Sequence, residues 1–240
     1  CRFGWTRDTS EQACASCSSK SDFPVVPPFP FSSDQLEPRA THCRASLLSD
    51  FAGADVPGFA WKSLGGQGGH TCYEVAPAAR AFITSNFPAC DLRGSVVNRR
   101  QCDLPSFDIL VAGFPCQPFS ALGERGGLDE WRGRGRLVDA SLAAIKHRRP
   151  RAFILENVAN FAKLDDGRAR GYVMGFLEKL STYDLHERVL CTSEYGLPQT
   201  RKRWYVVGVR RDAVQMQFSW PSMLPMLSLT AVLGPPPARS

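Results

Sequence analysis

Two residues of this chain combine reactive side chains with positions at the ends of apolar runs. Cys116 follows Phe107–Ala112 within Gly-Phe-Pro-Cys-Gln-Pro-Phe, and Glu156 follows Phe-Ile-Leu. A thiolate is a nucleophile, and a carboxyl group at the edge of a core is expected to have a raised pKa that suits it to proton donation. The prolines on either side of Cys116 predict a rigid turn and favour a functional cysteine over a buried core cysteine. Glu156 could instead be a capping or ion-paired acid.

A glycine turn and a second acid suggest a nucleotide-like ligand. Gly53 follows an apolar run, and Glu74 comes about twenty residues later, the spacing of an acid that binds ribose hydroxyls. An ordinary turn glycine and a surface acid would look the same.

These residues need elements to position them. Apolar runs predict strands, and amphipathic stretches between them predict helices. The expected strands are 46–51, 71–75, 107–112, 152–158, 185–191 and 204–209, and the expected helices are 59–64, 77–86, 137–147 and 172–180. This alternation predicts an α/β fold with a doubly wound, mostly parallel sheet. The strand ends that carry Gly53, Cys116 and Glu156 would then share one crevice.

Composition narrows the class of protein. The 240 residues are 43% hydrophobic, enough for one sizeable core. The net charge of +6 comes from arginine and fits a polyanion such as nucleic acid, although an arginine-rich protein without such a partner fits too. No run of 18 apolar residues and no signal-peptide pattern occur, so we expect no membrane association and no export.

The nine cysteines form no disulfide framework, and we expect them to be reduced. Cys14 and Cys17 have metal-ligand spacing, but no second pair at finger spacing accompanies them. We assign no metal ligand in this chain, and half of a zinc site completed in a longer chain stays an alternative. The start at Cys1 suggests a fragment or a processed piece.

Composition and hydrophobic pattern divide the chain into three segments. Residues 1–45 are rich in Ser and Pro and are expected to be poorly ordered. Residues 46–212 carry the alternating strands and helices of a catalytic core. In residues 213–240 the pattern fades, as in a linker to a further domain.

Three blocks, in this order, carry a resemblance to a known family: "FDILVAGFPCQPFS", "FILENVANF" and "YGLPQTRKRWYVVG". They resemble the cytosine-C5 DNA methyltransferase family over residues 46–212. The resemblance implies a Rossmann-like, S-adenosylmethionine-dependent core with a reversed last strand in its sheet. It also implies double-stranded DNA as substrate, with the target cytosine flipped out of the helix.

The resemblance assigns roles on the substrate side. Cys116 would add to C6 of cytosine, Glu156 would protonate or hydrogen-bond N3, and Arg201 and Arg203 would bind the O2 edge, unless that pair is only a basic surface pair. Asn157 would orient Glu156 and the loop. The residues expected around the base are Gln117, Ser120, Asn157 and Gln199. Loop 120–136 would close over the base, with its arginines on phosphates.

On the cofactor side the resemblance implies Phe51, Gly53, Glu74, Asp91 and Pro115. Glu74 would hold the ribose, Asp91 rather than Asp103 would hold the adenine amino group, and Pro115 would line the methionine end. The family's Phe-x-Gly-x-Gly-Gly motif here reads Phe-Ala-Gly-Ala-Asp-Val, with Asp55 at the second glycine. We expect this acid to face the methionine carboxylate and to weaken cofactor binding.

Two alternatives stay open. An RNA-directed relative that methylates tRNA is one, although the single proline before Cys116 and the serine at 120 favour DNA. A non-catalytic module that keeps the fold and engages a protein partner is the other, because the cofactor motif is altered and a target recognition domain is expected beyond this chain. The expected compartment is the nucleus in a eukaryote or the nucleoid-containing cytoplasm in a bacterium.

Overall fold

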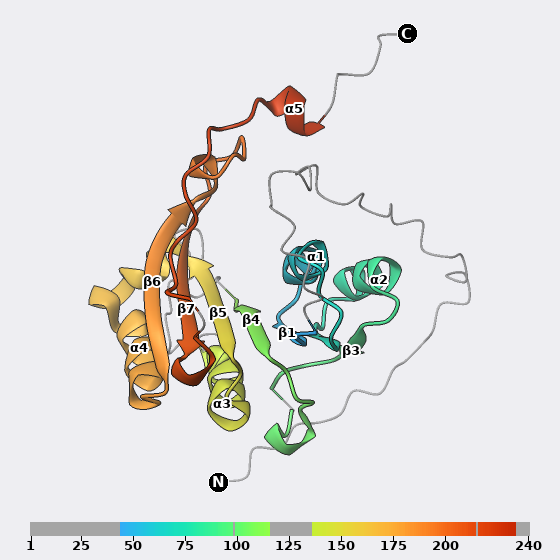
Figure 1. Cartoon of the computed structure of the whole chain (residues 1–240), viewed down its shortest axis with the longest axis vertical. Helices are drawn as coiled ribbons and strands as arrows, with labels where there is room; N and C mark the ends of the chain where they lie inside the picture. Colours follow the sequence, from blue (N-terminus) through green and yellow to red (C-terminus); the bar gives the residue numbers. More distant parts are fainter. Residues whose placement is uncertain (1–43, 98, 116–135, 215, 234–240) are drawn as a thin grey trace, which may run out of the picture.

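The computed structural model describes residues 44–97, 99–115, 136–214 and 216–233. These residues form one twisted sheet with helices against both faces (Figure 1). The strands are β1 (Leu47–Asp50), β2 (His70–Tyr73), β3 (Asp91–Arg93), β4 (Ile109–Gly113), β5 (Ala152–Val158), β6 (Tyr183–Cys191) and β7 (Lys202–Arg210). The helices are α1 (Val56–Ser63), α2 (Pro77–Asn86), α3 (Val138–Arg148), α4 (Arg168–Lys179) and the short α5 (Leu229–Leu233).

The strand order is β3-β2-β1-β4-β5-β7-β6. Strands β1 to β5 are parallel to one another, and β7 runs antiparallel to both β5 and β6. The order reverses direction between β1 and β4, which is the switch point where open α/β sheets bind ligands. The predicted doubly wound sheet with a reversed last strand is confirmed.

The core explains why these segments are strands. In β5 the side chains of Phe153 and Leu155 are fully buried and pack with Leu48 and Leu110 of neighbouring strands and with Trp204 of β7. These residues face α3 and α4. The smaller cluster of Cys72, Ile83 and Phe87 lies with Phe59 between α1, α2 and the β2–β3 edge.

The ends of elements follow local chemistry. Helix α2 begins at Pro77, where the missing N–H costs nothing, and matches the expected range. Helix α3 ends before Arg149, whose φ of 51° is left-handed, with Pro150 next. Helix α1 begins at Val56, three residues earlier than expected, because Pro57 suits the first turn. Strand β3 was not predicted, because it has only three residues, of which the first is exposed and the other two are half-buried.

No helix in the described ranges has the length and apolar character needed to cross a membrane.

Candidate active site

The carboxyl ends of β4 and β5 and the amino end of the reversed β7 bring two predicted catalytic residues together. Glu156 of β5 is aligned with Gly113 of β4 and with Tyr205 of β7. Arg203 reaches back from β7, and its Nε lies 3.0 Å from Glu156 Oε1. Both side chains are mostly buried, with 25% of Glu156 and 17% of Arg203 exposed. The parallel end of β5 and the reversed β7 therefore pair an acid with a cation over one sheet face.

A cavity of about 580 Å³ opens on this face beside α1. Glu156, Arg201 and Tyr205 line it together with apolar side chains of β1, β4 and β5. Burial raises the pKa of Glu156, and the charges of Arg203 and Arg201 only partly offset that effect. The carboxyl group is therefore biased toward its protonated form, which can donate a proton. Tyr205 was not predicted as a site residue. Successive residues of a strand face opposite sides of the sheet, so the buried Trp204 could have indicated that Tyr205 faces the cavity side.

Asn157 fixes the chain that leads to the predicted nucleophile. Its side chain is fully buried, Nδ2 donates to the Phe114 carbonyl oxygen at 3.1 Å, and Oδ1 accepts from the Val158 N–H at 2.8 Å. This arrangement ties β5 to the segment just before Pro115 and Cys116. Cys116, Gln117, Ser120 and the loop up to residue 135 lie outside the described residues.

The other two residues expected at the base lie near the turn between β6 and β7. Arg201 is exposed, yet it lines the 580 Å³ cavity. Thr192 anchors this turn: its N–H donates to the Arg201 carbonyl, and its hydroxyl donates to the Gln199 carbonyl. Gln199 is exposed and is not part of the cavity lining.

The glycine turn and Glu74 meet as predicted. The Glu74 carboxylate accepts hydrogen bonds from the backbone N–H groups of Gly53, Val75 and Ala76, each at 2.7 Å. Gly53 has φ of +55°, and a Cβ at this position would have open space around it. Backbone conformation, rather than crowding, therefore favours glycine here.

A second cavity, of about 210 Å³, lies beside this turn. Phe51, Glu74 and Pro115 contribute to it, so three of the five expected cofactor residues line one site. The remaining walls come from Tyr73, Val75, Gly94, Ser95, Val96, Val97 and Leu137. A third cavity, near 670 Å³, lies at the β6 edge and contains none of the predicted residues.

The structure does not bring Asp91 to this cavity. Asp91 is the first residue of β3, at the opposite end of the strand from the ligand edge of the sheet. Its carboxylate is half exposed and lies 2.7 Å from Arg93 Nη2. The expected contact with the adenine amino group therefore has no geometric support, because a residue at the amino end of a parallel strand points away from the crevice.

Asp55 differs from expectation more sharply. Its side chain is fully buried beneath α1, with Oδ2 2.9 Å from His70 Nε2, and it lines neither the 210 Å³ nor the 580 Å³ cavity. Burial alone would lower the pKa of His70, but contacts with Asp55 and Cys90 carry it up to about 9, so the acid faces a cation. The expectation that Asp55 faces and repels a cofactor carboxylate is therefore wrong, because its side chain is directed to His70.

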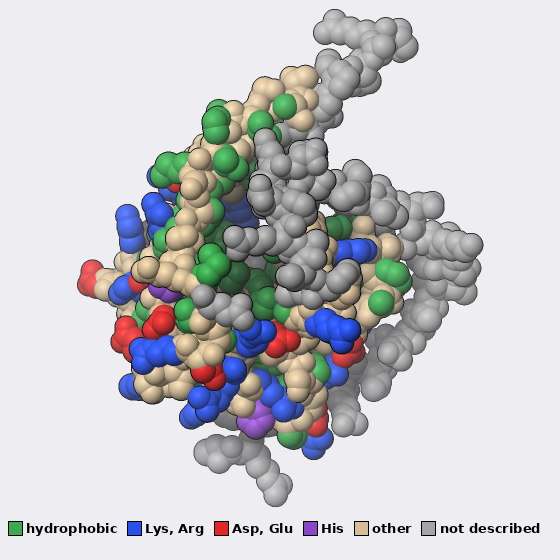
Figure 2. All heavy atoms as spheres, in the orientation of Figure 1, with side chains coloured by type: hydrophobic (Ala, Val, Ile, Leu, Met, Phe, Trp, Pro, Cys, Tyr) green, Lys and Arg blue, Asp and Glu red, His purple; other side chains and the backbone are tan. Residues whose placement is uncertain are grey.

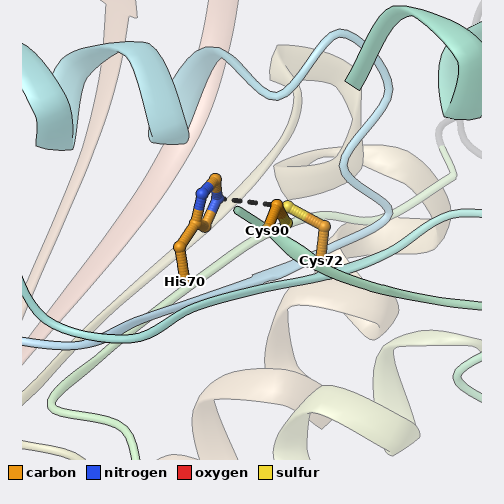
Figure 3. Close-up of side chains that lie close together, drawn as sticks. All are labelled: His70, Cys72 and Cys90. Carbon is orange, nitrogen blue, oxygen red and sulfur yellow. Dashed lines mark hydrogen bonds between the residues drawn. The ribbon is translucent and has the colours of Figure 1, made fainter. Parts of the chain in front are cut away.

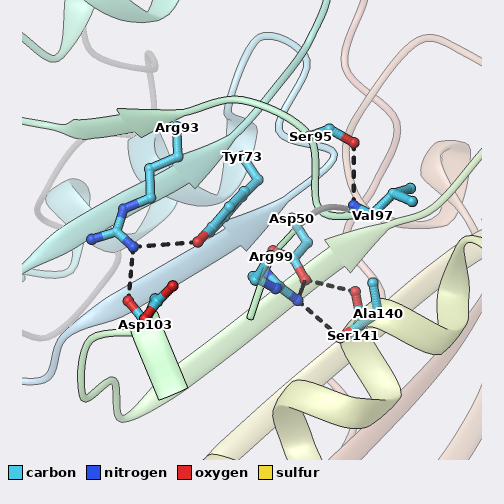
Figure 4. Close-up of polar contacts among 9 residues, drawn as sticks. All are labelled: Asp50, Tyr73, Arg93, Ser95, Val97, Arg99, Asp103, Ala140 and Ser141. Carbon is cyan, nitrogen blue, oxygen red and sulfur yellow. Dashed lines mark hydrogen bonds and ion pairs between the residues drawn. The ribbon is translucent and has the colours of Figure 1, made fainter. Parts of the chain in front are cut away.

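A buried ion pair at the end of β1 escaped sequence reasoning. Arg99 donates from Nη1 to Asp50 Oδ1 at 2.5 Å and from Nη2 to Oδ2 at 2.8 Å, and Ser141 of α3 donates to the same carboxylate (Figure 4). Its guanidinium lies 4.6 Å from the Tyr73 ring centre. Arg99 thereby fastens the segment after β3, which lines the smaller cavity, to β1 and α3.

Seven arginines in the described ranges form ion pairs with acidic side chains, so part of the arginine charge is locally balanced. Figure 2 shows Lys and Arg side chains interspersed with Asp and Glu on the visible face. The ion pairs are Arg93–Asp91, Arg99–Asp50, Arg100–Asp103, Arg170–Glu187, Arg203–Glu156, Arg210–Asp212 and Arg211–Asp184. A nucleic-acid interface therefore has to be argued from the site and not from net charge.

Comparison with known proteins gives consistent matches. The family model for the C-5 cytosine-specific DNA methylase matches residues 51–230. Type II methyltransferase M1.ScrFI of Lactococcus lactis subsp. cremoris is 37% identical over 139 residues, 58% of this chain and 35% of that protein. Type II methyltransferase M.SsoII of Shigella sonnei is 28% identical over 225 residues, 92% of this chain and 55% of that protein.

Solved structures show a similar fold. A candidate DNA modification methyltransferase from an E. coli prophage superposes with a TM-score of 0.64 at 19% identity, over 80% of this chain and 56% of that one. The Dnmt2 methyltransferase of S. pombe superposes with a TM-score of 0.57 at 17% identity, over 74% and 52%. The present chain spans about a third to about half of the length of these curated relatives.

Proposed function

Because this chain belongs to the C-5 cytosine-specific DNA methylase family, we propose that it carries the catalytic core that transfers a methyl group from S-adenosylmethionine to C5 of cytosine in double-stranded DNA. The observation that carries the proposal is the mostly buried carboxyl group of Glu156, which lines the 580 Å³ cavity and pairs with Arg203. Asn157 adjoins this pair and holds the backbone that leads to Cys116.

The chemistry begins with nucleophilic addition. C5 of cytosine is too weakly nucleophilic to accept a methyl group directly, so the Cys116 thiolate forms a bond to C6 and the C5–C6 π electrons move toward C5, N3 and O2. Glu156 supplies a proton or a hydrogen bond at N3, where the negative charge builds up. The direction of its pKa shift suits this role, since burial favours the acid form.

The arginines and the later steps complete the cycle. Arg203 keeps the Glu156 carboxyl group in place and, with Arg201, presents guanidinium donors to the O2 edge of the base. Once C5 carries the methyl group, loss of the C5 proton to a base and departure of the Cys116 thiolate restore the aromatic ring. The target base must leave the helical stack to reach Glu156 at the floor of a cavity.

The smaller cavity suits part of the cofactor, which supplies the electrophilic methyl group when bound. Glu74 offers carboxylate oxygens beside the Gly53 turn for ribose hydroxyls, and Phe51 and Val96 offer apolar surface to a flat ring. Pro115 borders the same cavity and precedes Cys116 directly, which puts the cofactor site next to the nucleophile in the sequence.

Cofactor binding is the first test. Calorimetric titration of the 240-residue chain with S-adenosylmethionine should show one site, and Glu74→Gln should weaken it at least tenfold because a ribose acceptor loses its charge. Asp91→Asn should leave affinity unchanged, since Asp91 lies away from the cavity. Asp184→Asn, in a surface ion pair with Arg211, is a matched control. Equal binding by Glu74→Gln and the native chain would contradict the cofactor assignment.

Covalent trapping tests the catalytic step. On duplex DNA with 5-fluorocytosine at the target, no C5 proton can leave, so an adduct through Cys116 should survive denaturing electrophoresis. Cys116→Ser should abolish this adduct, and Cys102→Ser, which replaces an exposed free cysteine, should not. A chain that binds cofactor and DNA but forms no adduct would be a binding module. An adduct on RNA alone would identify an RNA methyltransferase.

A further inference from the structure

Three potential metal ligands converge under α1, away from the catalytic pair. The side-chain ligand atoms of His70, Cys72 and Cys90 all lie within 4.8 Å of one another (Figure 3). His70 and Cys72 come from β2, and Cys90 immediately precedes β3. Cys72 Sγ lies 3.2 Å from His70 Nε2, and Cys72 is fully buried.

Asp55 adds a fourth group with unused binding capacity. Its carboxylate is fully buried, and neither oxygen has a hydrogen-bond donor among the described residues, although Oδ2 lies 2.9 Å from His70 Nε2. A buried carboxylate whose close partner in the described residues is one imidazole keeps lone pairs free for a cation. Gly58 of α1 closes the cluster from above, because a Cβ there would lie 2.0 Å from Asp55 Oδ2.

We propose that Asp55, His70, Cys72 and Cys90 bind one divalent zinc-class ion. Two thiolates, an imidazole and a carboxylate form a ligand set typical of tetrahedral Zn²⁺. Bond lengths of about 2.0–2.3 Å place neighbouring tetrahedral ligand atoms about 3.3–3.8 Å apart. The contacts of His70 Nε2 with Asp55 Oδ2 and Cys72 Sγ, at 2.9 and 3.2 Å, would widen by roughly half an ångström or less. Asp55 lies outside the group of three whose ligand atoms are all within 4.8 Å of one another, so its carboxylate would move inward to become the fourth ligand.

Metal binding at this cluster should depend on pH. A bound ion would displace the protons that the imidazole and thiol groups carry. Affinity for the metal should fall as pH is lowered, because each ligand must lose its proton.

The place of the cluster in the fold indicates a structural role. Four protein ligands close the coordination sphere and leave no open position for catalysis. The ion would tie Asp55, in the turn after β1, to β2 and to the segment before β3. That turn carries Gly53, whose N–H bonds to Glu74. This proposal is independent of methyl transfer, and its test needs no activity.

Metal content and cobalt spectroscopy provide the test. All samples carry Cys14→Ser and Cys17→Ser, so that this other spaced pair cannot contribute. The purified 240-residue chain should contain about one zinc per molecule, and Co²⁺ should give thiolate-to-cobalt charge-transfer absorption at one equivalent. Cys90→Ser, at the half-buried rim, should weaken cobalt binding by more than about tenfold. Cys102→Ser is the matched control and should bind like its parent.

Several outcomes would overturn the proposal. Failure of the folded parent to take up zinc or cobalt would leave the cluster as a hydrogen-bonded ion pair only. Unchanged affinity in both Cys90→Ser and Asp55→Asn, with circular dichroism confirming the fold, would place any bound metal elsewhere. Mass spectrometry would identify a disulfide in place of a metal site if Cys72 and Cys90 resist thiol labelling and the unlabelled chain is two hydrogens lighter than the reduced chain.

Discussion

Replacing Arg99 by methionine tests whether the pair at the end of β1 positions the cofactor wall. The Arg99 side chain is 1% exposed and Asp50 is fully buried, so water cannot replace the lost partner. Arg99→Met keeps much of the aliphatic stem but removes two hydrogen bonds to Asp50 and one to the Ala140 carbonyl. Ser141 would then be the remaining described donor to the buried carboxylate.

The expected loss follows from leaving one charge buried. Breaking a buried ion pair by removing one partner costs about 3–5 kcal/mol of unfolding free energy. For a chain of this size each kcal/mol lowers the melting temperature by about 2–4 °C, so a drop of roughly 6–20 °C is expected. The double variant Asp50→Asn, Arg99→Met should lose less unfolding free energy than the sum of the two single variants. The difference, the coupling energy of a direct pair, should be about 1–3 kcal/mol.

Urea unfolding followed by circular dichroism measures these differences. Arg100→Met is the matched control. Arg100 is an exposed neighbour that forms a surface ion pair with Asp103, so the stability of this variant should be indistinguishable from native. Below the new melting temperature, Arg99→Met should also weaken S-adenosylmethionine binding, since residues 94–97 line the smaller cavity. A loss below about 1 kcal/mol for Arg99→Met, the range of a surface pair, would refute the reasoning.

Three further changes test other parts of the structure. Glu156→Gln should lower kcat/KM by about 10²–10⁴-fold. Burial raises the pKa of Glu156 and the acid form is the active one, so the activity of the native chain should fall as pH rises through that pKa. This loss of activity at high pH should be absent in the variant. Gly208→Ala should cost about 1–3 kcal/mol in urea unfolding, because the new Cβ would lie 2.2 Å from the Phe153 ring. Asp55→Gly should destabilise the chain by about 2–3 kcal/mol, since relief of a left-handed aspartate is smaller than the loss of the partner of a buried His70; a more stable variant would contradict the ion pair.

The sheet was predictable where strands are mostly apolar and at least half-buried along their whole length. The run 152–158 matches β5 residue for residue, because Phe153 and Leu155 contact one helical layer while Ile154 faces the other side. Once β4 and β5 are recognised as parallel, the nearness of Glu156 to the end of β4 follows from topology alone. The same reasoning correctly joined Gly53 with Glu74.

Residues whose partners are distant in the sequence were not predictable. Asp50 and Arg99 are 49 residues apart, and no periodic pattern marks an arginine for burial. Asp91 was assigned through the resemblance alone, and its distance from the cavity depends on where a three-residue edge strand begins. The four groups around His70 come from the turn after β1, from β2 and from the start of β3, so no short ligand motif exists to be found.

The altered glycine motif is best understood through backbone and burial together. Phe51, Gly53 and Asp55 all have φ between 52° and 56°, so the turn keeps a left-handed conformation at the second glycine position although glycine is absent there. Aspartate is among the few residues that tolerate this region at modest cost. The Asp55 side chain then points beneath α1 toward His70, so its charge lies outside the lining of the cofactor cavity. The substitution that seemed to damage the cofactor site instead adds a buried polar contact that holds the turn in place, so the altered motif alone does not argue against cofactor binding.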